Sequence, residues 1–125
     1  MKTLLLIEDN LDIRENITEM LELEGYSVIV AVDGGMGYQL AVEEIPDIIL
    51  CDIMMPVMNG YEVLKHMKNN SSTAHIPFIF ISASTEKKDI QIGIDMGASA
   101  YIRKPFEMEE LFDVVAKFCP KDYLQ

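Results

Sequence analysis

The sequence predicts an α/β fold, a three-layer α/β/α sandwich built on a five-stranded parallel sheet with five helices. Short apolar runs, of which Ile48-Ile49-Leu50-Cys51 is the clearest, are typical of strands buried on both faces. A segment with apolar residues at helical spacing follows each run, so strands and helices alternate. Short crossovers of this kind favour parallel strands joined by right-handed connections. A chain of 125 residues fits a single domain over residues 1–125.

The first half of the chain shows this alternation clearly. Asn10 is a good N-cap, apolar residues follow it at helical spacing, and Gly25 is a typical stop. The segment after Gly25 alternates only weakly, which predicts a less buried strand. Gly35 and Gly37 make the second helix the least regular, since an interior glycine costs about 1 kcal/mol relative to alanine. We therefore expect strands over 3–7, 26–31 and 48–52, with helices between Asn10 and Gly25 and over 36–44.

The second half opens with Asn59-Gly60-Tyr61-Glu62, which is close to a capping box and starts a third helix. We expect strands over 76–81, running into Ser82, and over 100–102, with a helix over 86–96 that stops at Gly97. Acidic residues near Glu107 suit the N-terminal dipole of a last helix, and Pro120 lies just past its end. The residues expected to face the core are Val63, Leu64 and Met67 in the third helix and Met108, Leu111, Phe112, Val115 and Phe118 in the last.

Composition restricts the possible functions. The net charge of −11 disfavours direct nucleic-acid binding, which needs basic patches facing phosphates. No apolar run approaches the roughly 18 residues of a membrane-spanning helix. The apolar run at the N-terminus is too short for a signal peptide and is followed by acids. Cys51 and Cys119 fit reduced, buried thiols, so we expect a cytoplasmic protein that binds neither membranes nor nucleic acids directly.

Polar side chains follow four of the predicted strands at the point where each ends: Glu8 and Asp9, Asp52, Ser82, and Lys104. Because the carboxyl ends of parallel strands share one edge of the sheet, these groups are expected to meet. An aspartate after a strand is by itself more often a solvated turn residue, but three crowded carboxylates repel unless a cation neutralises them. Mg²⁺ prefers such oxygen ligands. A lysine and a hydroxyl beside a nucleophilic aspartate suit phosphoryl transfer.

The same residues carry a family resemblance over essentially the whole chain. The matching positions are Glu8-Asp9, Asp52 with Met55-Pro56 and Gly60, Ser82-Ala83, and Lys104-Pro105-Phe106. In these motifs and their separations the chain resembles a response-regulator receiver domain of two-component signalling, of the chemotaxis-receiver kind. The resemblance implies a flavodoxin-like sandwich with strand order 2-1-3-4-5.

The resemblance implies that Asp52 accepts a phosphoryl group from a histidine kinase or a histidine phosphotransfer protein. The step would depend on Mg²⁺ and be catalysed by the domain on itself, so no separate turnover substrate, and hence no enzyme in the usual sense, is expected. Asp9 and Asp52 would bind Mg²⁺ directly together with the backbone carbonyl of Met54, and Glu8 would act through water.

Three further residues receive roles by the same resemblance. Ser82 would hydrogen-bond the phosphoryl group, Lys104 would pair with it, and Tyr101 would swing inward as Ser82 moves. The Lys104–Pro105 peptide bond would be cis. Met54 and Ser84 flank the approach of a hydrolytic water, and since neither is a strong base we expect slow loss of the phosphoryl group.

The fourth helix carries two apolar stripes, and only one of them can face the sheet. The resemblance implies that Ile90 and Ile94 lie outward, where with Tyr101 they would form the surface that contacts a downstream protein or a second copy of the chain. Isolated exposed apolar residues need no function, so this alternative stays open. The residues expected to face inward are Ile92, Gly93 and Met96.

Two other functions compete with signalling. The first is a Mg²⁺-dependent phosphatase with an aspartate nucleophile, but such enzymes usually carry a second acid two residues later, where this chain has Met54. The second is a pseudo-receiver that binds a partner without phosphorylation, which the complete set of site residues disfavours. Asp33-Gly34-Gly35-Met36-Gly37 lacks the lysine of a phosphate-binding loop and is read as a glycine turn.

Overall fold

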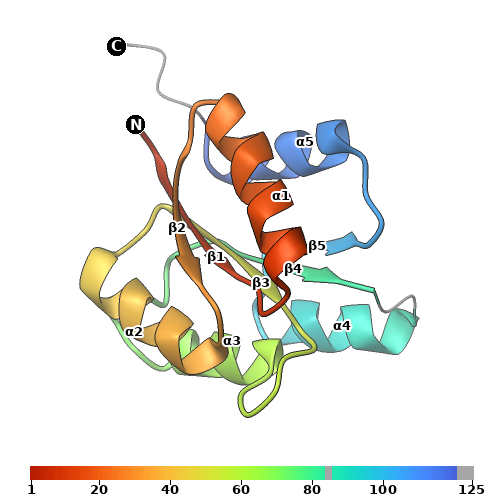
Figure 1. Cartoon of the computed structure of the whole chain (residues 1–125). Helices are drawn as coiled ribbons and strands as arrows, with labels where there is room; N and C mark the ends of the chain where they lie inside the picture. Colours follow the sequence, from red (N-terminus) through yellow and green to blue (C-terminus); the bar gives the residue numbers. More distant parts are fainter. Residues whose placement is uncertain (84–85, 121–125) are drawn as a thin grey trace.

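The computed structural model describes residues 1–83 and 86–120 and contains one five-stranded parallel sheet with the strand order β2-β1-β3-β4-β5 (Figure 1). The predicted flavodoxin-like fold and its strand order are confirmed. The elements are β1 (Thr3–Ile7), α1 (Leu11–Leu23), β2 (Ser27–Ala31), α2 (Gly34–Glu44), β3 (Ile48–Asp52), α3 (Gly60–Lys68), β4 (Phe78–Ser82), α4 (Lys87–Asp95), β5 (Ala100–Arg103) and α5 (Met108–Phe118).

Helices cover both faces of the sheet, with α1 and α5 on one side and α2, α3 and α4 on the other (Figure 1). Successive side chains of a strand point to opposite faces, so each strand supplies both cores. In β1, Leu4 and Leu6 pack with α1 and α5, while Leu5 and Ile7 pack with α2 and α3. The three inner strands β1, β3 and β4 are almost entirely buried, which explains their continuous apolar sequence.

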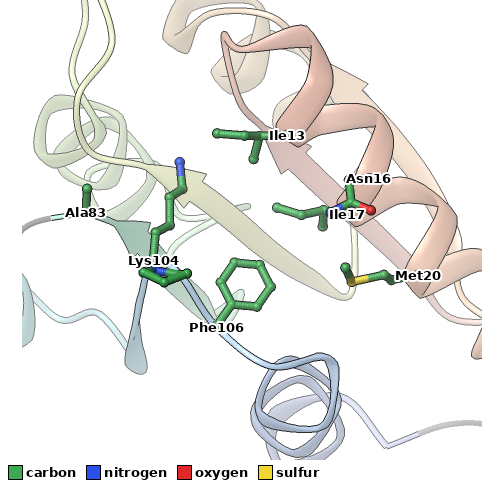
Figure 2. Close-up of a pocket in the computed structure, with 8 residues that line it drawn as sticks. Ile13, Asn16, Ile17, Met20, Ala83, Lys104 and Phe106 are labelled. Atoms are coloured by element: carbon green, nitrogen blue, oxygen red, sulfur yellow. The ribbon is translucent and has the colours of Figure 1, made fainter.

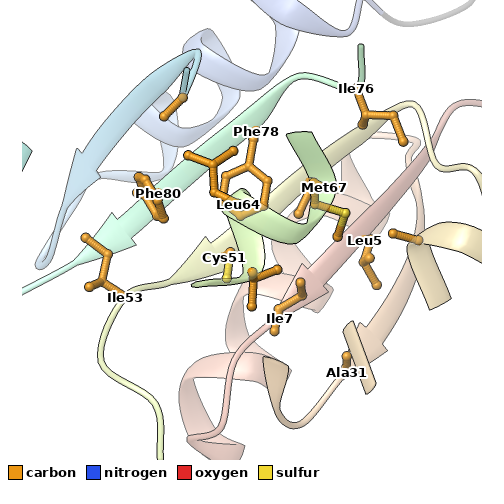
Figure 3. Close-up of a cluster of buried hydrophobic side chains, with 14 of the residues drawn as sticks. Leu5, Ile7, Ala31, Cys51, Ile53, Leu64, Met67, Ile76, Phe78 and Phe80 are labelled. Carbon is orange, nitrogen blue, oxygen red and sulfur yellow. The ribbon is translucent and has the colours of Figure 1, made fainter. Parts of the chain in front are cut away.

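The core under α2 and α3 contains both phenylalanines of β4 (Figure 3). Phe78 and Phe80 of β4 meet edge to face, with ring centroids 5.2 Å apart. Leu64 and Met67 of α3 cover the neighbouring part of β3 and β4, as predicted for the inward face of this helix. Cys51 lies in the same core and Cys119 in the opposite one, so the expectation that both thiols are buried is confirmed.

Side-chain caps begin the first three helices. The carboxamide of Asn10 accepts the amide of Ile13, and Asn59 forms a complete capping box with Glu62. Asp33 accepts the amide of Met36 and starts α2 at Gly34, two residues earlier than predicted. The prediction put the start after the glycine pair, whereas the capping carboxylate decides it.

Two further boundaries differ from the prediction. Strand β4 begins at Phe78 rather than at residue 76, since Pro77 has no amide hydrogen for the ladder. Met108, expected in the core face of α5, is 45% exposed. It is the first residue of the helix, and helical side chains point toward the N-terminus, so its side chain projects past the sheet. Leu111 and Val115, one turn apart, are the buried residues of α5.

Candidate functional site

The carboxyl edge of the sheet brings together the polar residues that the sequence placed at strand ends. Glu8 follows β1, Asp52 is the last residue of β3, and Ser82 is the last residue of β4. These three side chains are almost fully buried, whereas Asp9 is exposed. The side chain of Lys104, directly after β5, extends to Glu8 and Asp52, and its backbone amide donates to the carbonyl of Ser82 at 2.8 Å.

Lys104 makes two ion pairs at the centre of the site. Its ammonium nitrogen lies 2.9 Å from Oε1 of Glu8 and 3.2 Å from Oδ2 of Asp52. The second carboxylate oxygen of each acid has another partner: Oε2 of Glu8 accepts the amide of Asn10 at 3.1 Å, and Oδ1 of Asp52 accepts the amide of Met54 at 3.3 Å. The lysine therefore holds two carboxylates that would otherwise repel each other in a poorly solvated place.

Burial changes the pKa values of both Glu8 and Lys104 in this cluster. Desolvation is the main reason why the pKa of the Glu8 carboxyl lies above its ordinary value, and the charge of Asp52 adds to the effect. The hydrogen bond from Lys104 acts in the opposite direction. Burial by itself would lower the pKa of the Lys104 amine, but the hydrogen bond to Glu8 and the negative charges beside it raise that pKa above its ordinary value. Additional positive charge at this edge would stabilise the ionised carboxylates.

The acids are arranged to hold a small divalent cation. Glu8, Asp9 and Asp52 each offer a carboxylate oxygen, and these three oxygens lie within 4.8 Å of one another. All three donors are oxygens, and the side chain of Asp9 is exposed, so water can reach the site. This matches the preference of Mg²⁺ for one or two carboxylates and several waters. The donor chemistry fits the predicted metal; the role of the Met54 carbonyl stays a prediction.

A glycine lets the N-terminus of α3 approach the end of β3. A Cβ atom on Gly60 would lie 2.4 Å from the carbonyl oxygen of Asp52 and 2.9 Å from Cα of Ile53. The amide of Gly60 donates to the carbonyl of Ile53 at 2.9 Å, which closes the loop between the two elements. The loop after Asp52 is thereby held close to the carboxylate, so any larger residue at position 60 would displace it.

The residues assigned to switching are placed as follows. Ser82 is fully buried, and Tyr101 of β5 is half-buried with its ring 6.3 Å from that of Phe80. The Lys104–Pro105 peptide bond is cis, as predicted. Ser84 lies outside the residues that the structure describes. The inward movement of Tyr101 stays a prediction.

The orientation of α4 differs from the prediction. Ile92, expected to face the sheet, is 45% exposed, while Ile94 is 41% exposed and Ile90 is half-buried. Gly93 determines the rotation of this helix, because a Cβ atom there would lie 2.8 Å from the ring of Phe80. The inward stripe thus runs along residues 90, 93 and 96 at a spacing of three.

Two contacts of the site were not anticipated from the sequence. Arg14 of α1 donates to the backbone carbonyl of Glu8 at 3.0 Å and so fixes the turn that presents both acids. The sequence feature that could have indicated this contact is the position of Arg14 one helical turn after the Asn10 cap, close to the Glu8-Asp9 turn. The hydroxyl of Tyr61, the residue after Gly60, donates to the carbonyl of Asp89 at 3.0 Å and links α3 to α4, a pairing that no sequence pattern indicates.

A hollow of about 400 Å³ lies beside Lys104, between α1 and the segment after β5 (Figure 2). Ile13, Ile17 and Met20 of α1 line one wall, and Phe106 lines the other.

Within residues 1–83 and 86–120, no helix is both long enough and apolar enough to cross a bilayer.

Comparison with known proteins gives consistent matches. The family model described as response regulator receiver domain matches residues 4–116. The DNA-binding dual master transcriptional regulator RpaA of Synechocystis sp. is 38% identical over 111 residues, which are 89% of this chain and 46% of that protein. The chain spans about half the length of the curated relatives it matches.

Solved structures agree with this match. The chemotaxis response regulator CheY4 of Vibrio cholerae superposes with a TM-score of 0.89 at 30% identity, covering 94% of this chain and 98% of that one. The receiver domain of the sensor histidine kinase PA1611 from Pseudomonas aeruginosa, solved with a magnesium ion coordinated in its active-site cleft, gives a TM-score of 0.87 at 28% identity, covering 94% of this chain and 96% of that one.

Proposed function

Because this chain belongs to the response regulator receiver domain family, we propose that it accepts a phosphoryl group on Asp52 from the phosphohistidine of a kinase or phosphotransfer protein. The observation that carries this proposal is the position of Asp52, buried beside Glu8 and Asp9 and 3.2 Å from the ammonium of Lys104. An aspartate held in this way is both a nucleophile and one ligand of a cation site.

The chemistry that we propose is a single phosphoryl transfer. A carboxylate oxygen of Asp52 forms a bond to phosphorus while the bond from phosphorus to the donor's imidazole nitrogen breaks. The electron pair of that bond stays on the imidazole, which takes a proton from water. The product is an acyl phosphate, and its later hydrolysis returns the carboxylate and inorganic phosphate. The chain turns over no separate substrate.

The residues around Asp52 have distinct tasks in this step. Glu8, Asp9 and Asp52 would hold Mg²⁺, which when bound neutralises charge on the phosphoryl oxygens. Lys104 exchanges its pairing with Asp52 for pairing with the transferred group, and it keeps Glu8 as its second partner. Ser82 contributes a hydroxyl at the end of β4. These tasks position the reactants and balance charge, which is most of what phosphoryl transfer requires.

The partners follow from this chemistry and from surface charge. The donor is a histidine kinase or phosphotransfer protein, and the output surface includes Ile94 and Tyr101 at the edge shared by α4 and β5, for a downstream protein or a second copy. The relative RpaA is described as DNA-binding, and this chain matches less than half of it. With a net charge of −11, we propose that residues of this chain do not themselves contact nucleic acid.

Incubation with acetyl phosphate tests this function without a protein donor. Intact-mass measurement should show one phosphoryl group per chain with Mg²⁺ and none with EDTA, and Asp52→Asn should stay unmodified. A chain that releases phosphate continuously and never retains the group would be a phosphatase. A chain that takes up no phosphoryl group under these conditions would be a pseudo-receiver.

A further inference from the structure

Strand β2 forms an open edge of the sheet (Figure 1). The amide of Ser27 donates to the carbonyl of Lys2 at 2.9 Å, so the backbone groups of Ser27 face β1. Backbone groups of alternate residues in a strand point to opposite sides. Val28 and Val30 therefore turn their N–H and C=O groups away from β1, to a side where the described part of the chain places no further strand.

This edge lacks the features that usually prevent strands from pairing between molecules. Residues 26–32 contain no charged residue, no proline and no glycine, and four of these residues are valine or isoleucine. Short edge strands, prolines and charged side chains are the common protection. The opposite edge strand, β5, has it, because it is only four residues long and ends at the exposed Arg103, shortly before Pro105. An apolar, uncharged edge such as β2 favours pairing with another strand.

A second copy of β2 fits this edge in antiparallel orientation. A twofold axis perpendicular to the sheet at Ile29 places Val28 of each copy opposite Val30 of the other. Opposed residues whose backbone groups face each other exchange two hydrogen bonds. All outward N–H and C=O groups of these valines are then paired. A twofold axis along the strands would instead place donors opposite donors, so only the antiparallel pair is both closed and hydrogen-bonded.

The same axis brings the two α1 helices together on one face of the joined sheets. Leu11 and Arg14 line a hollow of about 340 Å³ between α1 and β2, and Glu22 and Leu23 line another one farther along α1. Because the axis reverses one copy, Leu11 of one helix is turned toward Leu23 of the other. These side chains are 54% and 85% exposed. Arg14 is likewise turned toward Glu22, so the flanks match in polarity and charge.

We propose that the β2 edge is a self-association surface, at which two copies of this chain join their sheets into one continuous sheet. The surface lies at the opposite edge of the sheet from β5, so it is separate from the output surface at α4 and β5. A five-residue strand buries little area, and the net charge of −11 on each chain opposes contact. The dimer should therefore be reversible, with a dissociation constant in the micromolar range or above.

Sedimentation velocity of the unphosphorylated chain, from about 10 μM to about 1 mM, tests the association. The average mass should rise from that of one chain toward that of two. Val30→Lys places a charge at the edge and should weaken association about tenfold, because the substitution counts twice in a symmetric pair. Ile94→Lys, at a 41% exposed isoleucine of α4, is the matched control and should associate like wild type. Circular dichroism checks that each variant is folded.

A cysteine at position 29 tests the register. In the proposed pair the two copies of residue 29 meet at the axis with their Cα atoms about 4.5 Å apart, a separation that a disulfide can span. Mild oxidation should therefore link Ile29→Cys into covalent dimers about tenfold faster than Ile94→Cys. Random collision would favour the second variant, since Ile94 is more exposed than the half-buried Ile29. Cys51 and Cys119 are buried and common to both variants.

Each other outcome overturns the inference. A wild-type chain that stays monomeric up to about 1 mM would show that the edge pairs with no second copy. A mass that continues to rise beyond two chains would indicate open association. Equal association of wild type and a folded Val30→Lys would place the contact on another surface. Equal linking of the two cysteine variants would refute the register, and this comparison decides if Val30→Lys does not fold.

Discussion

The ammonium of Lys104 lies 2.9 Å from the carboxylate of Glu8, although β5 and β1, which precede these residues, are separated in the sheet by β3 and β4. The lysine side chain therefore extends across the ends of two strands, and on the way it pairs with Asp52 at the end of β3. This arrangement ties the ends of β1, β3 and β5 into one charged cluster. Within this cluster the buried carboxylate of Glu8 costs free energy of folding.

Glu8→Gln should stabilise the metal-free protein at neutral pH. The pKa of Glu8 is raised in the folded state, mainly by burial, so the folded chain binds this proton more tightly than the unfolded chain. The stability that comes from this proton is present below the ordinary pKa and is lost as pH rises through the folded pKa. Glutamine does not titrate, so the gain should be near zero at acidic pH and should grow as pH rises through the folded pKa of Glu8.

Urea unfolding of wild type and Glu8→Gln in EDTA, over a series of pH values, measures this difference. Mg²⁺ should reverse the order of the two proteins, because it stabilises the carboxylate and has less affinity for an amide. A variant less stable than wild type at pH 7 without metal would contradict the account of Glu8.

Gly60→Ala should destabilise the chain by about 3 kcal/mol, because its Cβ would overlap the backbone of Asp52 and Ile53. The clash displaces the loop beside the acceptor, so labelling by acetyl phosphate should slow as well. The matched control is Gly35→Ala at the start of α2, where the nearest atom would lie 3.5 Å away. That change should stabilise the chain by about 0.5 kcal/mol. Equal stability of the two variants would refute the role of Gly60.

Tyr61→Phe should loosen α4 without disturbing the core. The ring would keep its edge-to-face contact with Phe80, and only the hydrogen bond to the Asp89 carbonyl would be lost, at a cost of about 1 kcal/mol. Hydrogen exchange should become faster for the amides of α4. Tyr38→Phe removes a hydroxyl that instead accepts from Asn70, and it should leave exchange in α4 unchanged.

Met54→Asn should shorten the lifetime of the phosphorylated chain. The exposed methionine excludes water from the approach to Asp52, whereas a carboxamide can orient it. Because asparagine is not a strong base, the increase in hydrolysis rate should be about tenfold, below the range of true general bases. The decay of the phosphorylated mass after removal of acetyl phosphate gives the rate. The control is Met108→Asn, at an exposed methionine of α5, and a half-life unchanged in Met54→Asn would exclude a role for this side chain.

The sequence was sufficient to predict the strands and their common edge, because each inner strand is an apolar run that ends on a polar group. Glu8, Asp52 and Lys104 were found in this way, and the structure brings them together. The strand order required the family resemblance, since alternating strands and helices are compatible with several orders. The cis peptide bond before Pro105 was likewise predicted only from the family resemblance.

Other features depend on tertiary contacts that periodicity cannot resolve. The rotation of α4 is set by Gly93 against the ring of Phe80, and the inward residues are three apart, whereas the sequence predicted that Ile92 and Met96, four apart, face the sheet. The hydrogen bond from Tyr61 to Asp89 joins two helices whose relative position the sequence does not specify. The positive φ of Val57 could not be predicted either, because valine rarely adopts this conformation.

The central claim, that Asp52 is the phosphorylated residue, is tested most directly by locating the modification. Borohydride reduces an aspartyl phosphate to homoserine, a stable product that tandem mass spectrometry assigns to one position. After incubation with acetyl phosphate and Mg²⁺, we expect homoserine at position 52 alone, and none when EDTA replaces Mg²⁺. Homoserine at another aspartate, or its complete absence from a chain that gains the mass of a phosphoryl group, would contradict the account.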